Sequence, residues 1–129
     1  MKCLSCKQPW ADLIVGGVKD VENRSWSTRY RGPLLIHAGL TVNVAGIEWL
    51  RRWRDIEIDR SALPLGAILG AVDLVDCRKT RASRWHHHGA VGWYFENPRR
   101  LQTPIPYKGQ LGVFNVPDHL LPNSWRPRY

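Results

Sequence analysis

The sequence lacks a long hydrophobic run. Its longest uncharged apolar stretch, around residues 63–72, contains one proline and two glycines, and a transmembrane helix needs about 20 apolar residues. The amino terminus also lacks the order of cationic, apolar and small residues that marks a secretion signal. We therefore expect a protein that stays in the cytoplasm and has no membrane partner.

Cysteines are few and odd in number: Cys3, Cys6 and Cys77. Without a secretion signal, reduced thiols are the simplest interpretation. Cys3 and Cys6 form a CxxC, and the histidines at 86–88 could complete a zinc site with Cys77, but the second cysteine pair of a structural zinc site is missing. We predict buried thiols, no metal and no other cofactor.

Acidic residues are also scarce. Nineteen Lys and Arg against 11 Asp and Glu give a net charge of +8, and fourteen of the basic residues are arginine. The planar guanidinium pairs with phosphate and stacks on bases, so this composition favours a nucleic-acid partner over an acidic protein or a membrane. The alternative is that the charge serves only solubility.

The chain shows no internal repeat, no low-complexity tract and no regular strand–helix alternation. Its 129 residues, 43% of them hydrophobic, suit one domain. Residue patterns predict helices over 9–16 and 43–54, and strands at 2–6, 21–26, 34–38, 67–77, 90–96, 101–105 and 111–116. We predict an α+β fold, a small mixed β-barrel with about six strands and two or more helices, over residues 1–121, followed by an irregular tail at 122–129.

Local signals refine these elements. The first helix should cover one opening of the sheet with an apolar face, and the second should bury Trp49 and Trp53. Asn97-Pro98 should form a turn, and Pro104 should confine its strand to an edge or bulge. Residues 78–88, which are rich in arginine and histidine, are expected to form an exposed loop.

The segment Gly17-Val-Lys-Asp-Val-Glu-Asn-Arg24 carries a distinctive charge pattern. If it is extended, Glu22, Arg24 and Trp26 share one strand face, with Lys19 beside them at the turn. Such a cluster can hold a base by stacking and hydrogen bonds while a spare positive charge meets a phosphate. The alternative is an exposed hairpin with a screened ion pair worth under about 1 kcal/mol.

Several segments together resemble the ASCH domain, named after the activating signal cointegrator. They are Lys7-Gln-Pro-Trp-Ala11, the G-x-K-x-x-E-x-R segment at 17–24, Arg31-Gly-Pro-Leu-Leu-Ile36, the apolar segment 65–77 and Pro104-Ile-Pro-Tyr-Lys-Gly109. The resemblance covers about residues 3–117. It implies a PUA-like barrel with a cleft between the first helix and the strand after it.

The resemblance implies a binding module that grips single-stranded RNA or DNA, or a nucleic-acid end, in this basic cleft. Lys19, Glu22 and Arg24 occupy the three charged positions of the motif. The predicted nucleic-acid-binding residues are Lys7, Gln8, Trp10, Lys19, Glu22, Arg24, Trp26, Arg29, Arg31 and Lys108. Trp26 could instead be buried under the second helix. The sequence does not separate RNA from DNA.

Three further functions stay open. Some small ASCH-like proteins are amidohydrolases that deacylate a modified cytidine, with a threonine at the position of Glu22. Lys19, Glu22 and Arg24 are therefore also catalytic candidates. However, the two cations should depress the pKa of Glu22 and make it a poor base. A ribonuclease using the histidines at 86–88 is the other hydrolase hypothesis, against a simple basic loop. The family's namesake suggests partner recruitment instead, and exposed aromatic residues leave a homodimer open.

Overall fold

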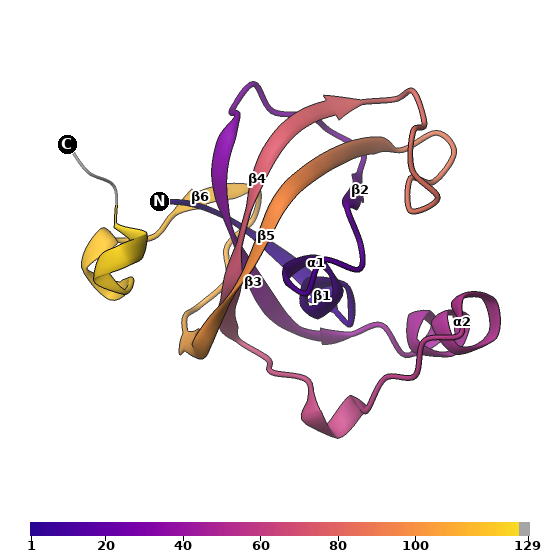
Figure 1. The fold of residues 1–129 in the computed structure, drawn as a ribbon, viewed down its shortest axis with the longest axis horizontal. Coiled ribbons are helices and arrows are strands. Elements are labelled where there is room, and N and C mark those ends of the chain that lie inside the picture. The colour runs from indigo at the N-terminus through magenta and orange to yellow at the C-terminus, as the bar shows by residue number, and fades with distance from the viewer. Residues whose placement is uncertain (127–129) are drawn as a thin grey trace.

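The computed structural model describes residues 1–126 and contains one six-stranded mixed sheet with strand order β2-β5-β4-β3-β1-β6 (Figure 1). The strands are β1 (Lys2–Gln8), β2 (Val21–Arg24), β3 (Gly32–Val42), β4 (Ala67–Arg78), β5 (Val91–Pro106) and β6 (Val113–Asn115). The helices are α1 (Trp10–Val15) and α2 (Val44–Arg54), with 3-10 turns η1 (Arg60–Ala62), η2 (Asp118–Leu120) and η3 (Asn123–Trp125). The predicted α+β class is confirmed.

The sheet curls towards a barrel but does not close. β1 runs parallel to β3, and the other four pairings are antiparallel. The two edge strands are the shortest, with four residues in β2 and three in β6, and no ladder joins them among residues 1–126. The predicted barrel is therefore an open one, and the opening faces the candidate site described below.

Helix α1 covers one end of the curled sheet, as the sequence predicts. It contacts β1, β3, β4 and β5, and the sheet curves around it in Figure 1. The side chains of Leu13 and Ile14 on this helix are buried, while that of Trp10 is partly exposed. The helix ends at the predicted glycine pair, where Gly17 has a φ of +80°, a conformation that favours glycine. The next residues then turn back into β2.

The predicted turn at Asn97-Pro98 is wrong, because both residues lie within strand β5. The strand runs without a break from Val91 to Pro106, and Asn97 takes a φ of 52° at an irregularity in its pairing with β4. An asparagine tolerates this conformation, so the residue that favours a turn here kinks a strand instead. Since β2 pairs only with residues 91–94, the half of β5 that contains Pro104 lies on an edge, as predicted.

Helix α2 begins where the sequence predicts it, because the Asn43 side chain accepts a hydrogen bond of 2.9 Å from the Gly46 N–H. Its buried face differs from the prediction. Gly46 and Leu50 are buried, whereas Trp53 is 61% exposed. The four-residue spacing of aromatic residues misled the assignment because Trp49 lies at the border of the buried face and Trp53 points away from it.

The predicted exposed loop at 78–88 is only partly exposed. Arg78 ends β4, and Trp85 and His86 are buried, with 4% and 0% of their surface exposed. The predicted irregular tail contains η3, and Trp125 packs against a core cluster that includes Leu101 and Leu121. Residues 127–129 lie outside the described part of the chain, and the division of the chain at residue 121 stays a prediction.

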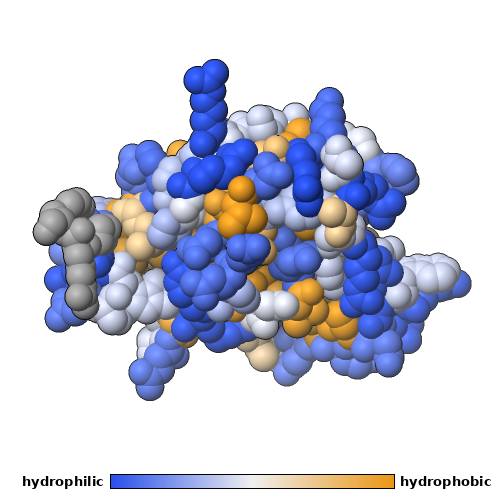
Figure 2. All heavy atoms as spheres, turned by 45° about the horizontal axis from the view of Figure 1, so that its top comes forward, coloured by the Kyte–Doolittle hydropathy of each residue, from blue (hydrophilic) through white to orange (hydrophobic). Residues whose placement is uncertain are grey.

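Hydrophilic residues cover most of the face shown in Figure 2, and the hydrophobic ones form small separate patches. Across residues 1–126, no helix has the length and apolar character needed to cross a membrane. The most exposed apolar side chains are Leu111 at 99% and Leu40 at 80%.

Candidate functional site

A cleft of about 560 Å³ lies where the sheet fails to close, between β1 and β2. Residues from α1, α2 and the segments 39–43, 85–87 and 110–112 complete its walls. Its lining combines three tryptophans with basic and amide side chains: Ser5, Cys6, Lys7, Trp10, Lys19, Glu22, Asn23, Arg24, Gly39, Leu40, Thr41, Asn43, Trp49, Trp85, His87, Gln110, Leu111 and Gly112. Its size suits a single nucleotide-sized ligand.

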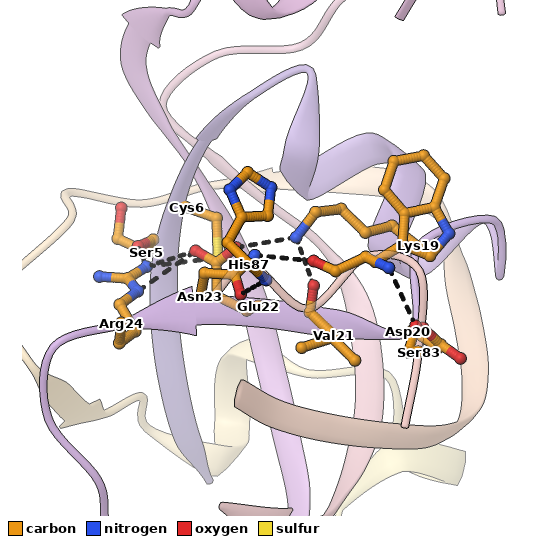
Figure 3. Close-up of polar contacts among 11 residues, drawn as sticks. Ser5, Cys6, Lys19, Asp20, Val21, Glu22, Asn23, Arg24, Ser83 and His87 are labelled. Atoms are coloured by element: carbon orange, nitrogen blue, oxygen red, sulfur yellow. Dashed lines mark hydrogen bonds and ion pairs between the residues drawn. The ribbon is translucent and has the colours of Figure 1, made fainter. Parts of the chain in front are cut away.

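A charge cluster forms the inner wall of the cleft. Glu22 lies between Lys19 and Arg24 (Figure 3): its Oε1 is 3.2 Å from Lys19 Nζ, and its Oε2 accepts from Arg24 Nη2 at 2.9 Å and Nε at 3.2 Å. Lys19 is 4% and Glu22 8% exposed. Lys19 also donates to the Val21 carbonyl. The alternative of an exposed, screened ion pair is therefore wrong, because the pair is buried.

The pKa of Glu22 is lowered. Burial by itself would raise the pKa of this carboxyl, but the charges and hydrogen bonds of Lys19 and Arg24 outweigh burial. This direction agrees with the expectation that the two cations depress the pKa of Glu22. Both carboxylate oxygens are engaged by cations, so the positions of the three charged side chains are fixed, and the cluster keeps one net positive charge.

Arg24 joins the two sides of the open sheet. Its Nη2 donates to the carbonyl oxygen of Ser5 on β1 at 2.8 Å and approaches Cys6 Sγ at 3.6 Å. Burial, followed by the charge of Glu22, raises the pKa of the Cys6 thiol, which stays protonated. Arg24 Nη1 has no partner among residues 1–126, so one side of the guanidinium can still donate to a ligand in the cleft.

Three tryptophans line the cleft. Trp49 of α2 lies 6.4 Å from Trp10 of α1 and 6.3 Å from Trp85, in edge-to-face arrangements. The guanidinium of Arg54 lies 4.5 Å from the centre of the Trp49 ring. Trp49 is partly exposed and Trp85 is buried. Aromatic faces bordered by cations are typical of surfaces that stack on nucleobases.

Asn23 fixes the loop that carries Trp85. Its Nδ2 donates to the Trp85 carbonyl at 2.8 Å, and its Oδ1 accepts from the His87 N–H at 2.8 Å. His87 is exposed at the cleft, 6.4 Å from Trp49. Its pKa is lowered by partial burial and then by the charges of Lys19, Arg54, Arg81 and His86, so the ring is neutral at pH 7.

A buried histidine supports the β1 wall. His37 Nε2 lies 2.7 Å from the Tyr107 carbonyl, and its Nδ1 lies 2.9 Å from the Ser5 hydroxyl. A carbonyl oxygen can only accept, so Nε2 carries the proton and the Ser5 hydroxyl donates to Nδ1. This pairing leaves the Ser5 oxygen able to accept a hydrogen bond from a ligand in the cleft.

The structure brings five of the predicted site residues to the cleft: Lys7, Trp10, Lys19, Glu22 and Arg24. The other five predicted residues do not line it. Gln8 is fully buried, where its amide donates to the Pro64 carbonyl and accepts from the Asp12 N–H. Trp26 packs edge-on against Trp93 with 36% of its surface exposed. The remaining three, all exposed, are Arg29, Arg31 and Lys108.

Sequence reasoning missed the contributions of Asn23, Trp49 and Trp85, and it considered His87 only within the ribonuclease hypothesis. Asn23 lies within the recognised charge motif, and its polar side chain between Glu22 and Arg24 was a usable signal. Trp49 and Trp85 were assigned to the core or to a loop, and only the tertiary fold brings them together. The cleft therefore has more aromatic surface than the sequence indicated.

The histidines at 86–88 do not act as one group. His86 is buried and bonded to the Tyr94 hydroxyl at 2.7 Å and to the Ala90 carbonyl at 2.8 Å. His88 is exposed and lies near Arg81 Nη1 at 3.2 Å. Only His87 lines the cleft. The arrangement therefore offers no adjacent acid and base for phosphodiester cleavage.

The prediction of buried thiols holds for Cys3 and Cys6, and Cys77 is partly exposed. Cys3 and Cys6 belong to different core clusters because they lie three positions apart, an odd spacing, on a strand whose side chains alternate between its faces. Burial raises the pKa of Cys3 to about 12. Within residues 1–126, no three His, Cys, Asp or Glu side chains gather as a set of metal ligands.

Comparison with known proteins agrees with the motifs of the cleft. The human protein named Activating signal cointegrator 1 is 43% identical over 128 aligned positions, and the mouse protein of the same name is 34% identical. Each alignment covers 88% of this chain but only 22% of the relative. The sequence model of the ASCH domain matches residues 4–109, which include most of β1, all of β2 to β5 and both helices. The chain belongs to the ASCH domain family.

Proposed function

We propose that the chain is a non-catalytic module that binds single-stranded RNA or DNA, or a nucleic-acid end, with one nucleotide held in the cleft between β1 and β2. The observation that carries this proposal is the meeting of Trp10, Trp49 and Trp85 with Lys7 and Arg24 in one cleft. Tryptophan faces stack on bases of any sequence, and cations meet the phosphates.

The charge distribution supports an anionic ligand. The chain carries a net charge of +8, and the Lys19–Glu22–Arg24 cluster retains one net positive charge. Lys7 is exposed at the cleft and makes no ion pair within residues 1–126, so its ammonium is free to meet a phosphate. Lys19 and Arg24 are held by Glu22, which makes Lys7 the better test of phosphate contact.

Family membership supports the same proposal. The resemblance to PUA-like barrels, which mostly read RNA or unusual bases, agrees with a nucleotide-sized cleft. The relatives are named for an activating signal, and the chain spans 22% of their length. The binding proposed here concerns this domain and not the activity of the full-length relatives.

Replacement of Lys7 should weaken binding in a salt-dependent way. We expect Lys7→Ala to lower the slope of log affinity against log salt by about 0.7, the contribution of one neutralised phosphate in a single strand. Lys79→Ala is the matched control, because Lys79 is exposed and does not line the cleft. Titration of fluorescent single-stranded RNA and DNA over a range of salt concentrations measures the slope. Equal slopes for both variants would place the phosphates elsewhere.

The same samples test the hydrolase hypothesis. The lowered pKa of Glu22 and the separation of the three histidines give no support to a cleavage mechanism through them. We expect the oligonucleotide to stay intact on a denaturing gel after incubation with the wild type. Shortened oligonucleotide would replace the binding proposal with a ribonuclease.

Binding should strengthen when the pH falls below the ordinary pKa of histidine. His87 has a pKa below its usual value of 6.5, so it is neutral at pH 7 and gains its positive charge only at lower pH. Bound phosphate favours the charged form, and affinity should therefore rise as the pH falls below about 6.5. We expect His87→Gln to remove this rise and His88→Gln to retain it, as measured by binding titrations between neutral and mildly acidic pH.

A cytoplasmic location and a homodimer stay predictions. The exposed Trp53 of α2 offers a hydrophobic contact to a second copy, but the single apolar side chains on the surface do not form a defined interface.

A further inference from the structure

The backbone of β1 has an alternating orientation that the pairings define. Met1 and Val116 exchange two hydrogen bonds, of 2.8 and 2.9 Å, and Cys3 lies opposite Phe114 two residues further on. In an antiparallel pair every second residue is bonded in this way. The N–H and C=O groups of the odd-numbered residues of β1 therefore face β6, while the carbonyl of Gln8 faces the other side and accepts from the Asn43 N–H at 2.7 Å.

This edge of β1 becomes open beyond β6. The ladder with β6 ends at Leu4, and the carbonyl of Ser5 is bonded to the Arg24 side chain at 2.8 Å. The next residue with outward-facing groups is Lys7, which lines the cleft. Because Gln8 faces β3, the backbone N–H and C=O of Lys7 face away from it, beyond the end of the β6 ladder, and neither bonds to a residue outside the strands among residues 1–126. A backbone donor and acceptor without protein partners must bond to water or to a ligand.

We propose that the backbone N–H and C=O of Lys7 bind the base-pairing edge of the nucleobase in the cleft, so that the ligand is a nucleotide whose base is unpaired. This inference rests on the proposed function. Each nucleobase carries a neighbouring donor and acceptor on its pairing edge, such as N3–H and O4 of uracil. That pair matches one strand residue, because the N–H and C=O of an extended residue point the same way.

A duplex cannot present this edge, since its bases already use it for pairing. The cleft should therefore select single-stranded or flipped-out nucleotides. The walls on either side support the selection: Trp10 begins the helix that follows β1, and Trp49 lies 6.4 Å from it. Their flat faces can stack on the base that the strand edge holds.

The open edge fits a base better than a peptide strand. Strand addition needs several consecutive pairs of backbone bonds. Here the carbonyl of Ser5 is already bonded by Arg24, and the strand ends at Gln8, because the next residue, Pro9, has no N–H and its carbonyl accepts from the Leu13 N–H. A single donor and acceptor pair is left, and that is the number that one base can use.

Methylated oligonucleotides test this contact directly. We expect a single-stranded RNA of 3-methyluridine to bind about tenfold more weakly than oligouridylate, because its methyl group replaces the N3–H that donates to Lys7 and collides with the carbonyl. An RNA of 5-methyluridine, which carries the methyl group away from the pairing edge, should bind within about twofold of oligouridylate.

A variant that changes the backbone of residue 7 is an independent test of this contact. Lys7→Pro removes the backbone N–H, whereas Lys7→Ala removes only the charge, and proline is tolerated where a strand N–H faces outwards. We expect Lys7→Pro to bind oligouridylate more weakly than Lys7→Ala by severalfold. If Lys7→Pro does not fold, the methylated RNAs still decide the matter.

The outcomes separate the inference from the proposed function. Equal binding of the three RNAs, with the salt slope still lowered by Lys7→Ala, would overturn the contact with Lys7 and leave the binding module in place. No binding of any RNA or single-stranded DNA would overturn both. Equal affinity for oligouridylate and for its duplex with oligoadenylate would also overturn the contact, since the duplex hides the edge.

Discussion

Replacing Glu22 with glutamine should lower the free energy of unfolding by about 3 kcal/mol. The substitution keeps the size of the side chain but removes the negative charge that holds two cations. Lys19 is 4% exposed and lies 3.2 Å from Glu22 Oε1, so it would be left buried beside Arg24 without a counter-ion. Uncompensated buried charge is among the most costly changes in a folded protein.

Chemical denaturation followed by circular dichroism measures this loss. Glu48→Gln is the matched control, because Glu48 also pairs with an arginine, Arg51, but both side chains are exposed on α2. Exposed pairs are screened by water, and we expect no measurable change for this variant. A loss of the same size in both variants would mean that the buried cluster does not stabilise the fold in the way described.

The pH dependence of stability should come partly from the same carboxyl. The folded state has a lowered pKa for Glu22, whose ordinary value is 4.5. The unfolded chain therefore binds the proton first, so the contribution is complete above about 4.5 and disappears as the pH falls through the lowered pKa. In Glu22→Gln the decline in stability over this acidic range should be shallower. An identical decline in the two proteins would exclude Glu22 as its source.

The charge cluster could be predicted from the sequence because its members are local. Lys19, Glu22 and Arg24 lie within six residues of each other, and the spacing of a strand brings Glu22 and Arg24 to one face. The role of Arg24 could not be predicted in the same way. Its bond to the Ser5 carbonyl joins residues 19 positions apart across the open sheet, and no local pattern reports such a contact.

The aromatic part of the cleft depends on tertiary packing. Trp10, Trp49 and Trp85 come from α1, α2 and the loop before β5, which are separated by more than 30 residues of sequence. Tryptophan contributes to both cores and binding surfaces, so its presence alone does not decide between the two. Trp53 shows the same limit, because the helical period that places it beside Trp49 in the sequence does not bury it.

Strand β5 shows where turn signals fail. Asn97-Pro98 normally ends a strand, but here β4 pairs with both halves of β5 and carries the irregularities in its register. Pairing over the long β4 strand outweighs the local preference, and Asn97 absorbs the kink with a φ of 52°. The Asn97-Pro98 pair therefore predicted the position of the irregularity correctly, but it did not predict that the strand continues through it.

Truncation of Trp49 should produce the largest loss of nucleic-acid affinity. We expect Trp49→Ala to weaken the binding of single-stranded RNA by about tenfold or more, since stacking of one base on an aromatic side chain contributes about 1–3 kcal/mol. Trp49 contacts both other tryptophans of the cleft, and Arg54 lies over its ring. Its removal would therefore take away a stacking face and the cation held above it.

Trp53→Ala is the matched control on the same helix. Trp53 is 61% exposed, carries Arg52 at 5.2 Å from its ring centre and does not line the cleft. It should bind RNA like the wild type, while Trp49→Phe should retain most of the affinity because it keeps a flat face. Thermal unfolding of each variant separates lost binding from lost folding. Weakened binding by Trp53→Ala with unchanged binding by Trp49→Ala would move the interface from the cleft to the outer face of α2, because only the exposed tryptophan could then be stacking on the bases.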